Sequence, residues 1–455
     1  MTHLLLAAAV LTMRVDYYHT GNATQEHFSL DRIVVEPLGW PGDPQKAIDT
    51  TARGKYFFEV IDDASKKVVY SRGFASVYGE WETTAEARAM NRTFSESLRF
   101  PGVDKPARIV LKKRDAKNAF QEIWSAKVDP ADKFIMRAGA LAPAGALIKL
   151  HERGDPATKL DLLVIGDGYT AAERGKFERD ARRLLQVFFA TSPFKEREND
   201  INVWGLVPAS TDSGISRPSD HIYKRTALGT TYDTFDSERY ILTERNRALR
   251  DIAANAPYEA IEILTNSNTY GGGGICNLYS TVAADSVWAS YIFIHEFGHH
   301  LAGLADEYYT SDVAYLPPAE KVEPWEPNVT ALLDPLRLKW RDLIAPGTPT
   351  PTPWPKDEFD RYHQVDAERR RALRAAHRPE SEMDALFKEE LARDTALLNG
   401  PALKGKVGAY EGANYEARGY YRPQTDCIMF TRDAVGFCTV CRRAIEETLD
   451  LYAKR

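Results

Sequence analysis

VWASYIFIHEFGH, residues 287–299, is the stretch of this sequence that decides the fold. Its apolar first half predicts a buried helix, which continues through two histidines, His295 and His299. Side chains four positions apart lie on the same face of a helix, so both imidazoles can bind one metal ion. Glu296 then lies beside the ion, where its carboxylate can act on a bound water molecule. The stretch therefore predicts a zinc centre with Glu296 as the catalytic base.

The alternative interpretation is a chance match, in which His295 and His299 are structural histidines on an exposed helix. Gly298 argues against it, because glycine inside a helix costs about 1 kcal/mol relative to alanine. Such a cost indicates close packing or the approach of a substrate. His300 points to another face of the helix, and we interpret it as a supporting or structural residue rather than a ligand.

A third ligand should follow the helix closely, because catalytic zinc usually has three protein ligands and one water. Gly303 is a typical helix terminator that lets the chain turn back, and Asp306 and Glu307 are the next oxygen donors. We expect Asp306 to be the ligand. Glu307 is the alternative ligand, or else forms a buried ion pair or supports a ligand histidine. The expected content is one Zn2+ per chain; calcium is compatible with the sequence, but no pattern supports it.

The sequence outside this helix divides into two domains. Residues 13–137 alternate short apolar runs with turn signals, which is typical of a β-sandwich. A linker rich in alanine, glycine and proline follows at 138–147. Residues 148–455 then alternate strand and helix patterns, as in an α/β domain. Within this domain, the charged and alanine-rich stretch at about 356–399 predicts an inserted, solvated helical hairpin on the surface.

The chain begins with a short apolar run, Leu4 to Leu11. This run is too short to cross a bilayer but has the length of a signal-peptide core. We therefore expect residues 1–12 to be a signal peptide, and the protein to be secreted, periplasmic or at the cell surface; the alternative is a first β-strand. No other segment predicts a membrane span. The net charge of -6 gives no reason to expect a nucleic-acid partner.

The cysteines number four, which is even: Cys276, Cys427, Cys438 and Cys441. Cys438 and Cys441 have the C-x-x-C spacing of zinc or redox sites, but the sequence has no second such pair to complete a structural zinc site. Export would permit disulfides. We therefore expect disulfides, whose pairing the sequence does not determine.

Three runs extend the pattern around the histidines: HEFGHHLAGLADEY (295–308), LVIGDGYT (163–170) and YGGGGICN (270–277). They resemble segments of the IgA-peptidase family of bacterial zinc metallopeptidases, which are metzincin-like zincins. The resemblance extends over nearly the whole chain. It implies an α+β or α/β zincin-like catalytic domain preceded by an all-β sandwich domain.

The resemblance also implies a methionine turn beneath the metal, a role that Met429 fits. The sequence departs from the general metzincin pattern at the third ligand. Gly303 comes four residues after His299 rather than three, and the acidic Asp306 stands near the expected third histidine. This departure separates the chain from ordinary metzincins.

Four glycines, Gly271 to Gly274, precede the predicted metal-binding helix. Glycine lets another backbone approach a strand edge closely. We expect Gly272, Gly273 and Gly274 to form an edge strand along which an extended substrate binds. A flexible loop explains the same run equally well.

These patterns together predict a secreted zinc-dependent endopeptidase. It would hydrolyse peptide bonds of a protein or peptide substrate through a zinc-bound water activated by Glu296. Tyr308, Tyr420 and Tyr421 are candidates for stabilising the oxyanion. We expect a monomer. The alternative is a catalytically silent, zincin-like surface protein that recognises protein or glycan through its β-sandwich. The sequence does not determine the physiological substrate.

Overall fold

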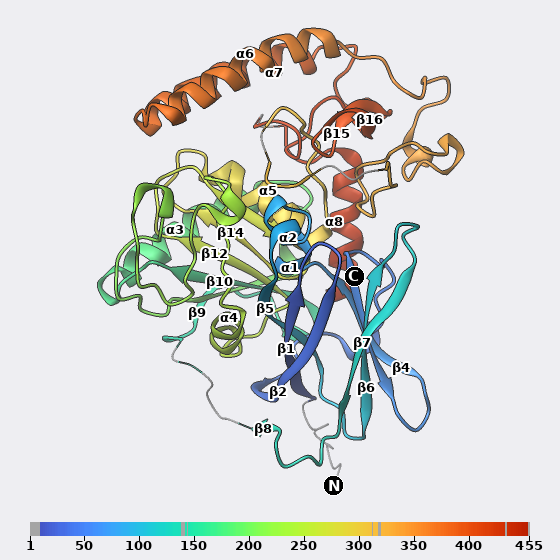
Figure 1. Cartoon of the computed structure of the whole chain (residues 1–455), viewed down its shortest axis with the longest axis vertical. Helices are drawn as coiled ribbons and strands as arrows, with labels where there is room; N and C mark the ends of the chain where they lie inside the picture. Colours follow the sequence, from blue (N-terminus) through green and yellow to red (C-terminus); the bar gives the residue numbers. More distant parts are fainter. Residues whose placement is uncertain are drawn as a thin grey trace.

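The structure is a computed structural model that describes residues 10–137, 142, 144–311, 313–316, 320–432 and 435–453. A β-rich N-terminal region and a mixed α/β C-terminal region lie against each other, with a helical hairpin at one end of the molecule (Figure 1). Among the helices that the structure describes, none combines the length and the apolar character needed to cross a bilayer.

The N-terminal region consists of two four-stranded sheets that share one core, a β-sandwich. Along β5, Phe94, Leu98 and Phe100 are buried while their neighbours are partly exposed, because successive side chains of a strand point to opposite faces. The strand orders are β5-β1-β2-β8 and β4-β3-β6-β7. The strands are β1 (Leu11–Gly21), β2 (Glu26–Gly39), β3 (Tyr56–Asp62), β4 (Val68–Phe74), β5 (Arg92–Pro101), β6 (Ala107–Arg114), β7 (Phe120–Val128) and β8 (Met136–Arg137).

The boundaries of this region differ slightly from those expected. β1 begins at Leu11, so Leu11 and Thr12, the last two residues of the expected signal peptide, belong to a strand. Residues 1–9 of that prediction lie outside the described residues, as does about half of the predicted linker at 138–147.

A six-stranded sheet forms the centre of the C-terminal region. Its order is β13-β14-β12-β10-β11-β9. The four central strands are parallel, and the two edge strands, β9 and β13, run antiparallel to their neighbours. The strands are β9 (Ile148–His151), β10 (Leu160–Asp167), β11 (Ile201–Leu206), β12 (Ala260–Thr265), β13 (Gly272–Ile275) and β14 (Tyr279–Ala283).

The two faces of this sheet are covered by different parts of the chain. Leu162 and Val164 of β10 point to the core formed with α3 (Arg174–Phe188) and α5 (Ala289–Ala302). Leu163 and Ile165 point to the opposite core. That core includes α4 (Asn246–Ala253) and also two short helices of the N-terminal region, α1 (Val77–Trp81) and α2 (Ala85–Ala89). The N-terminal region therefore completes the cover of the second face.

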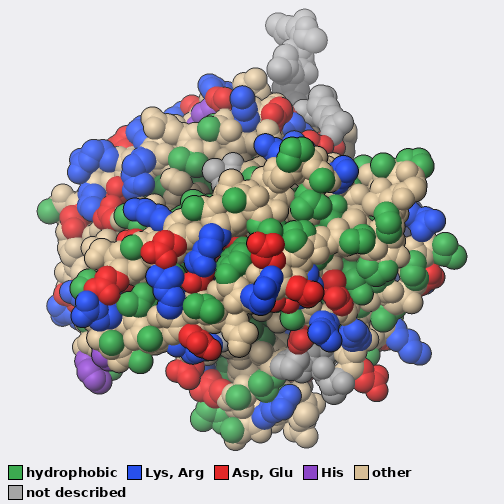
Figure 2. All heavy atoms as spheres, turned by 90° about the horizontal axis from the view of Figure 1, so that it is seen from above, with side chains coloured by type: hydrophobic (Ala, Val, Ile, Leu, Met, Phe, Trp, Pro, Cys, Tyr) green, Lys and Arg blue, Asp and Glu red, His purple; other side chains and the backbone are tan. Residues whose placement is uncertain are grey.

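The predicted insertion at 356–399 forms two antiparallel helices, α6 (Lys356–Ala375) and α7 (Glu380–Leu398). Seen from above, Lys and Arg side chains are interspersed with Asp and Glu (Figure 2). The hairpin is more than a solvated decoration, because Phe359, Leu386 and Phe387 are buried in the core that contains α5. The chain ends with a two-stranded sheet and a helix: β15 (Tyr410–Ala413), β16 (Glu416–Arg422) and α8 (Thr439–Tyr452).

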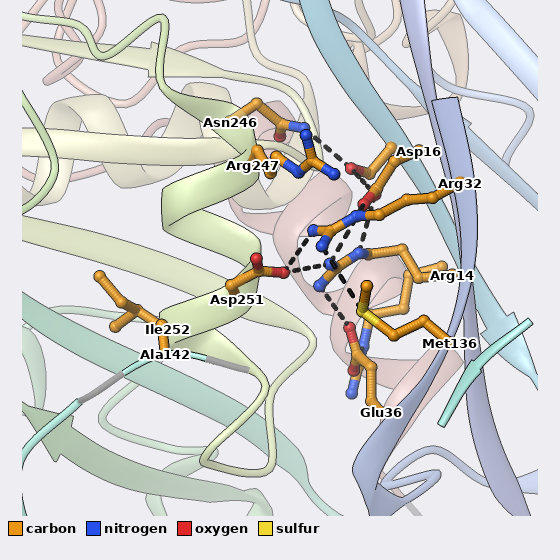
Figure 3. Close-up of polar contacts among 12 residues, drawn as sticks. Arg14, Asp16, Arg32, Glu36, Met136, Ala142, Asn246, Arg247, Asp251 and Ile252 are labelled. Carbon is orange, nitrogen blue, oxygen red and sulfur yellow. Dashed lines mark hydrogen bonds and ion pairs between the residues drawn. The ribbon is translucent and has the colours of Figure 1, made fainter. Parts of the chain in front are cut away.

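A buried cluster of charged side chains joins the two regions. Arg14 is fully buried on β1, where it contacts Asp16, Glu36 and Asp251. Arg32 also bridges Asp16 at 2.7 Å and Asp251 at 2.6 Å. Figure 3 shows the arginines of the N-terminal sheet pointing at Asp251 on α4. Each buried charge has a partner of opposite sign, which offsets the cost of removing it from water.

Replacing Asp251 by alanine should destabilise the protein, because Arg14 and Arg32 would each lose one partly buried anionic partner. We expect Asp251→Ala to lower the free energy of unfolding by about 1–3 kcal/mol, measured by denaturant unfolding. Glu178→Ala is the matched control. It removes a largely exposed ion pair with Arg182, for which we expect a change within about 0.5 kcal/mol. Equal effects of the two substitutions would contradict a stabilising role of the cluster.

Candidate metal centre

Helix α5 carries the buried His295 and also His299, which lines a cleft, and it ends at Ala302. Gly303 has a left-handed backbone, with φ of 59°, and its N–H donates to the His299 carbonyl. A side chain at this position would be strained, and its Cβ would also lie 2.7 Å from the Trp325 ring. The turn at Gly303 reverses the chain and brings Asp306 back toward the helix.

Three potential ligand atoms converge at this point. His295 Nε2 lies 3.2 Å from His299 Nε2, and Asp306 Oδ1 lies 3.0 Å and 3.3 Å from these two nitrogens. Ligands bound tetrahedrally to one zinc ion at about 2.0–2.1 Å would be separated by about 3.3 Å. The distances between the three ligand atoms therefore match those expected around one zinc ion.

Hydrogen bonds orient both imidazole rings. His295 Nδ1 donates to the carbonyl of Ile428 at 2.8 Å, and His299 Nδ1 donates to the carbonyl of Leu304 at 2.6 Å. With the proton held on Nδ1, the lone pair on each Nε2 faces the other ligand atoms. Both rings therefore present the form that binds a metal.

The electrostatics of the site favour a positive charge between these groups. Burial opposes protonation of His299, but the Asp306 carboxylate outweighs it and raises the pKa of His299 to about 9. Burial would raise the pKa of Asp306, yet His299 and His295 hold it well below its usual value.

Glu296 lies beside the predicted ligands. Ligand atoms of His295, Glu296 and His299 lie within 4.8 Å of one another. Desolvation raises the pKa of Glu296 above its ordinary value, although both histidines oppose the shift. A carboxylate with a raised pKa is suited to taking up and returning a proton.

Asp306 is held by a residue that the sequence analysis missed. The hydroxyl of Tyr415 donates to Asp306 Oδ2 at 2.6 Å, which leaves Oδ1 directed at the histidines. Tyr415 follows β15, more than a hundred residues after Asp306. No local signal in the sequence marks it.

Glu307 points away from this centre. Its Oε1 lies 3.3 Å from Cys441 Sγ and accepts a hydrogen bond from Asn328 Nδ2 at 2.9 Å. Of the two acids considered as third ligand, the structure therefore places Asp306 with the histidines and Glu307 elsewhere.

The expected disulfides are absent, and this expectation was wrong. All four cysteines are buried free thiols. Cys427 Sγ and Cys441 Sγ are 3.8 Å apart, whereas a disulfide requires about 2.05 Å. Cys276 lies instead beside Gly303 at the cleft.

Met429, the residue expected to form a methionine turn, packs against α5 near Gly298. It is fully buried. Its sulfur would lie 3.2 Å from a Cβ at position 298, and Phe437 would be closer still at 2.9 Å. Gly298 is therefore explained by close packing rather than by the approach of a substrate.

An open cleft with a cavity volume of about 520 Å³ lies over the site. It is lined by Glu296, His299 and Asp306, and also by Lys55, Glu80 and Arg114 of the N-terminal region. One wall thus comes from the β-sandwich and the adjoining α1.

The glycine run forms edge strand β13, so the loop interpretation was wrong. Gly272 donates to Arg239 and accepts from Ile241, so its backbone faces outward and is already paired. In an antiparallel strand, alternate residues face the same side. Gly274 therefore also faces outward, where it lines the cleft, whereas Gly273 turns toward β14.

Of the three candidate tyrosines, Tyr308 lines the cleft. Its hydroxyl accepts a hydrogen bond from Arg239 Nη2 at 3.0 Å, so its own proton remains available for donation. The Tyr420 hydroxyl contacts the Val322 carbonyl instead, and Tyr421 pairs with Thr330 through its backbone.

Comparison with known proteins gives a family match over most of the chain. The profile of the family described as IgA Peptidase M64 matches residues 148–449, and that of Peptidase M64 N-terminus matches residues 8–125. Among solved structures, metalloproteinase-II from Bacteroides fragilis is similar at 13% identity and a TM-score of 0.20, over 53% of this chain and 83% of that chain. At this TM-score the likeness does not establish a shared fold. No curated protein matches the chain.

Gly274→Ala should disturb the contact between α5 and β13. A Cβ there would lie 2.3 Å from the Glu296 carbonyl oxygen and 2.9 Å from His299 Cβ. We expect the free energy of unfolding to fall by about 1–3 kcal/mol. Gly175→Ala is the control, since its Cβ would meet only the end of the Arg179 side chain at 3.5 Å. That substitution should raise the free energy of unfolding by about 0.4–1 kcal/mol.

Tyr415→Phe should weaken metal binding without unfolding the protein, because Asp306 loses the hydrogen bond that orients it. We expect zinc affinity at this centre to fall roughly 10–100-fold, measured by competition with a zinc chelator. Tyr420→Phe removes a hydroxyl that contacts a carbonyl away from the ligands and should leave the affinity unchanged. Unchanged affinity in Tyr415→Phe would show that Asp306 needs no such support.

Proposed function

The chain belongs to the IgA peptidase M64 family, and we propose that it is a secreted zinc-dependent endopeptidase. Membership of a peptidase family supports a metallopeptidase acting on protein. The observation that carries the finer proposal is the convergence of His295, His299 and Asp306 beside Glu296, at the base of a cleft. Export rests on the apolar run at the start of the sequence.

The proposed ligands are His295 Nε2, His299 Nε2 and Asp306 Oδ1. Zinc, when bound there, supplies Lewis-acid chemistry that makes water a nucleophile near neutral pH and polarises a carbonyl. Three protein ligands would leave one coordination position open, as is usual in catalytic zinc sites.

The proton is moved by Glu296. Its carboxylate takes a proton from the attacking water and later gives it to the leaving amine. The raised pKa of Glu296 makes its carboxylate a stronger base than that of an ordinary glutamate. Tyr308 supports the reaction by donating its hydroxyl proton to the developing oxyanion, since Arg239 already donates to its oxygen.

The cleft favours an extended polypeptide. Gly274 offers its outward backbone N–H and C=O next to α5, where a substrate strand can pair with the sheet edge. Pairing cannot extend to Gly272, because Arg239 and Ile241 already occupy its groups. Lys55 and Glu80 face the cleft from the N-terminal region, so this region contributes to substrate selection rather than to a separate binding site.

Glu296→Gln should abolish cleavage while preserving the fold. Glutamine keeps the size of the side chain but cannot accept the proton, so we expect kcat/KM to fall at least about 100-fold. The assay uses a reduced and alkylated protein of mixed sequence as substrate, with product masses identifying the cut bonds. Metal content and Tm should match those of the wild type.

Arg114→Gln serves as the matched control, because it changes a charge in the cleft away from the metal ligands. It should alter KM or cleavage preference and retain most of kcat. Equal activity of Glu296→Gln and the wild type would contradict the proposal. Absence of cleavage by the zinc-loaded wild type would favour a silent binding protein.

A further inference from the structure

Four buried side chains converge beneath the catalytic centre, on segments far apart in the sequence. Glu307 directly follows Asp306, Cys427 opens the segment that contains Met429, and Cys438 and Cys441 lie in the first turn of α8. One ligand atom from each of the four lies within 4.8 Å of the others. Their exposed fractions range from 0 to 4%.

The spacing of these atoms matches a tetrahedral ion. Cys427 Sγ lies 3.8 Å from Cys441 Sγ, and Glu307 Oε1 lies 3.3 Å from Cys441 Sγ and 4.0 Å from Cys438 Sγ. With zinc–sulfur bonds of about 2.3 Å and a zinc–oxygen bond of about 2.0 Å, tetrahedral ligands would be about 3.8 Å apart for two sulfurs and about 3.5 Å apart for sulfur and oxygen.

A disulfide would leave part of this cluster unexplained. It would use two of the three thiols and leave the third, together with a buried carboxylate. Glu307 Oε2 is buried and accepts no hydrogen bond within the described part of the chain. A buried carboxylate needs a compensating partner, and a cation among the four side chains provides it.

We propose that Cys427, Cys438, Cys441 and Glu307 bind a second zinc ion with a structural role. Thiolates favour zinc over calcium or magnesium. Four protein ligands fill the tetrahedral sphere and leave no open position, so this ion takes no direct part in the reaction.

The surroundings of the four ligands support them. The backbone N–H of Cys438 donates to Cys427 Sγ at 3.2 Å, and that of Cys441 donates to Cys438 Sγ at 3.4 Å. These N–H groups belong to the start of α8, where the helix favours negative charge. Asn328 Nδ2 donates to Glu307 Oε1 at 2.9 Å and orients the carboxylate.

The second ion would connect directly to the catalytic centre. Glu307 is the neighbour of Asp306, and its N–H donates to the Met429 carbonyl at 2.8 Å. Ile428, between Cys427 and Met429, provides the carbonyl that orients His295. An ion that joins Glu307 and Cys427 to α8 therefore holds Asp306 and the Ile428 carbonyl in place.

Metal analysis of purified variants tests this proposal independently of peptidase activity. After dialysis against metal-free buffer, the wild type should contain two zinc ions per chain. His295→Ala with His299→Ala should retain one, and Cys438→Ala with Cys441→Ala should retain the other. Cys276→Ala, which removes a thiol outside the cluster, should retain both.

Cobalt substitution identifies the ligands of the ion that remains. The His295→Ala, His299→Ala protein loaded with Co2+ should show thiolate-to-cobalt charge-transfer absorption in the near ultraviolet. This variant keeps the test decisive even where the double cysteine variant does not fold. A single zinc ion in the wild type that disappears with the two histidines would overturn the proposal. A disulfide among Cys427, Cys438 and Cys441, found by mass spectrometry without reduction, would overturn it too.

Discussion

Two imidazole nitrogens from α5 and a carboxylate oxygen from the segment after it lie within 3.3 Å of one another, and much of the surrounding structure serves to hold them there. Lone pairs and negative charge at this distance repel unless a cation lies between them. The Ile428 and Leu304 carbonyls accept hydrogen bonds from the Nδ1 atoms of the two rings, and the Tyr415 hydroxyl donates to Asp306. Each of these contacts restricts a rotation that would otherwise separate the ligands.

Close backbone approach allows this arrangement. Helix α5 passes so near to β13 and to Met429 that glycine is required at Gly274 and Gly298. The same closeness positions Glu296 over the sheet edge, next to the backbone groups that a polypeptide would pair with. The packing of the core therefore also sets the geometry of the site. If α5 moved outward to admit larger side chains, both histidines would move away from Asp306.

The N-terminal region is part of the same body. Its helices α1 and α2 cover one face of the central sheet, and its residues line the cleft. The ion pairs of Arg14 and Arg32 with Asp251 join the N-terminal region to α4 of the C-terminal region. At the start of α8, the thiols of Cys438 and Cys441 approach Glu307.

Much of this protein could be predicted from local pattern alone. The i, i+4 spacing of His295 and His299, the adjacent Glu296 and the succession of a β-rich and an α/β region follow from periodicities within short windows, because helix and strand geometry is local. The sequence left Asp306 and Glu307 as alternatives and suggested disulfides for the cysteines. Only the tertiary structure separated the two acids, joined Tyr415 to Asp306 and brought three thiols to Glu307. These contacts join residues about a hundred or more positions apart, and no local periodicity encodes such distances; the packing of the whole chain decides them.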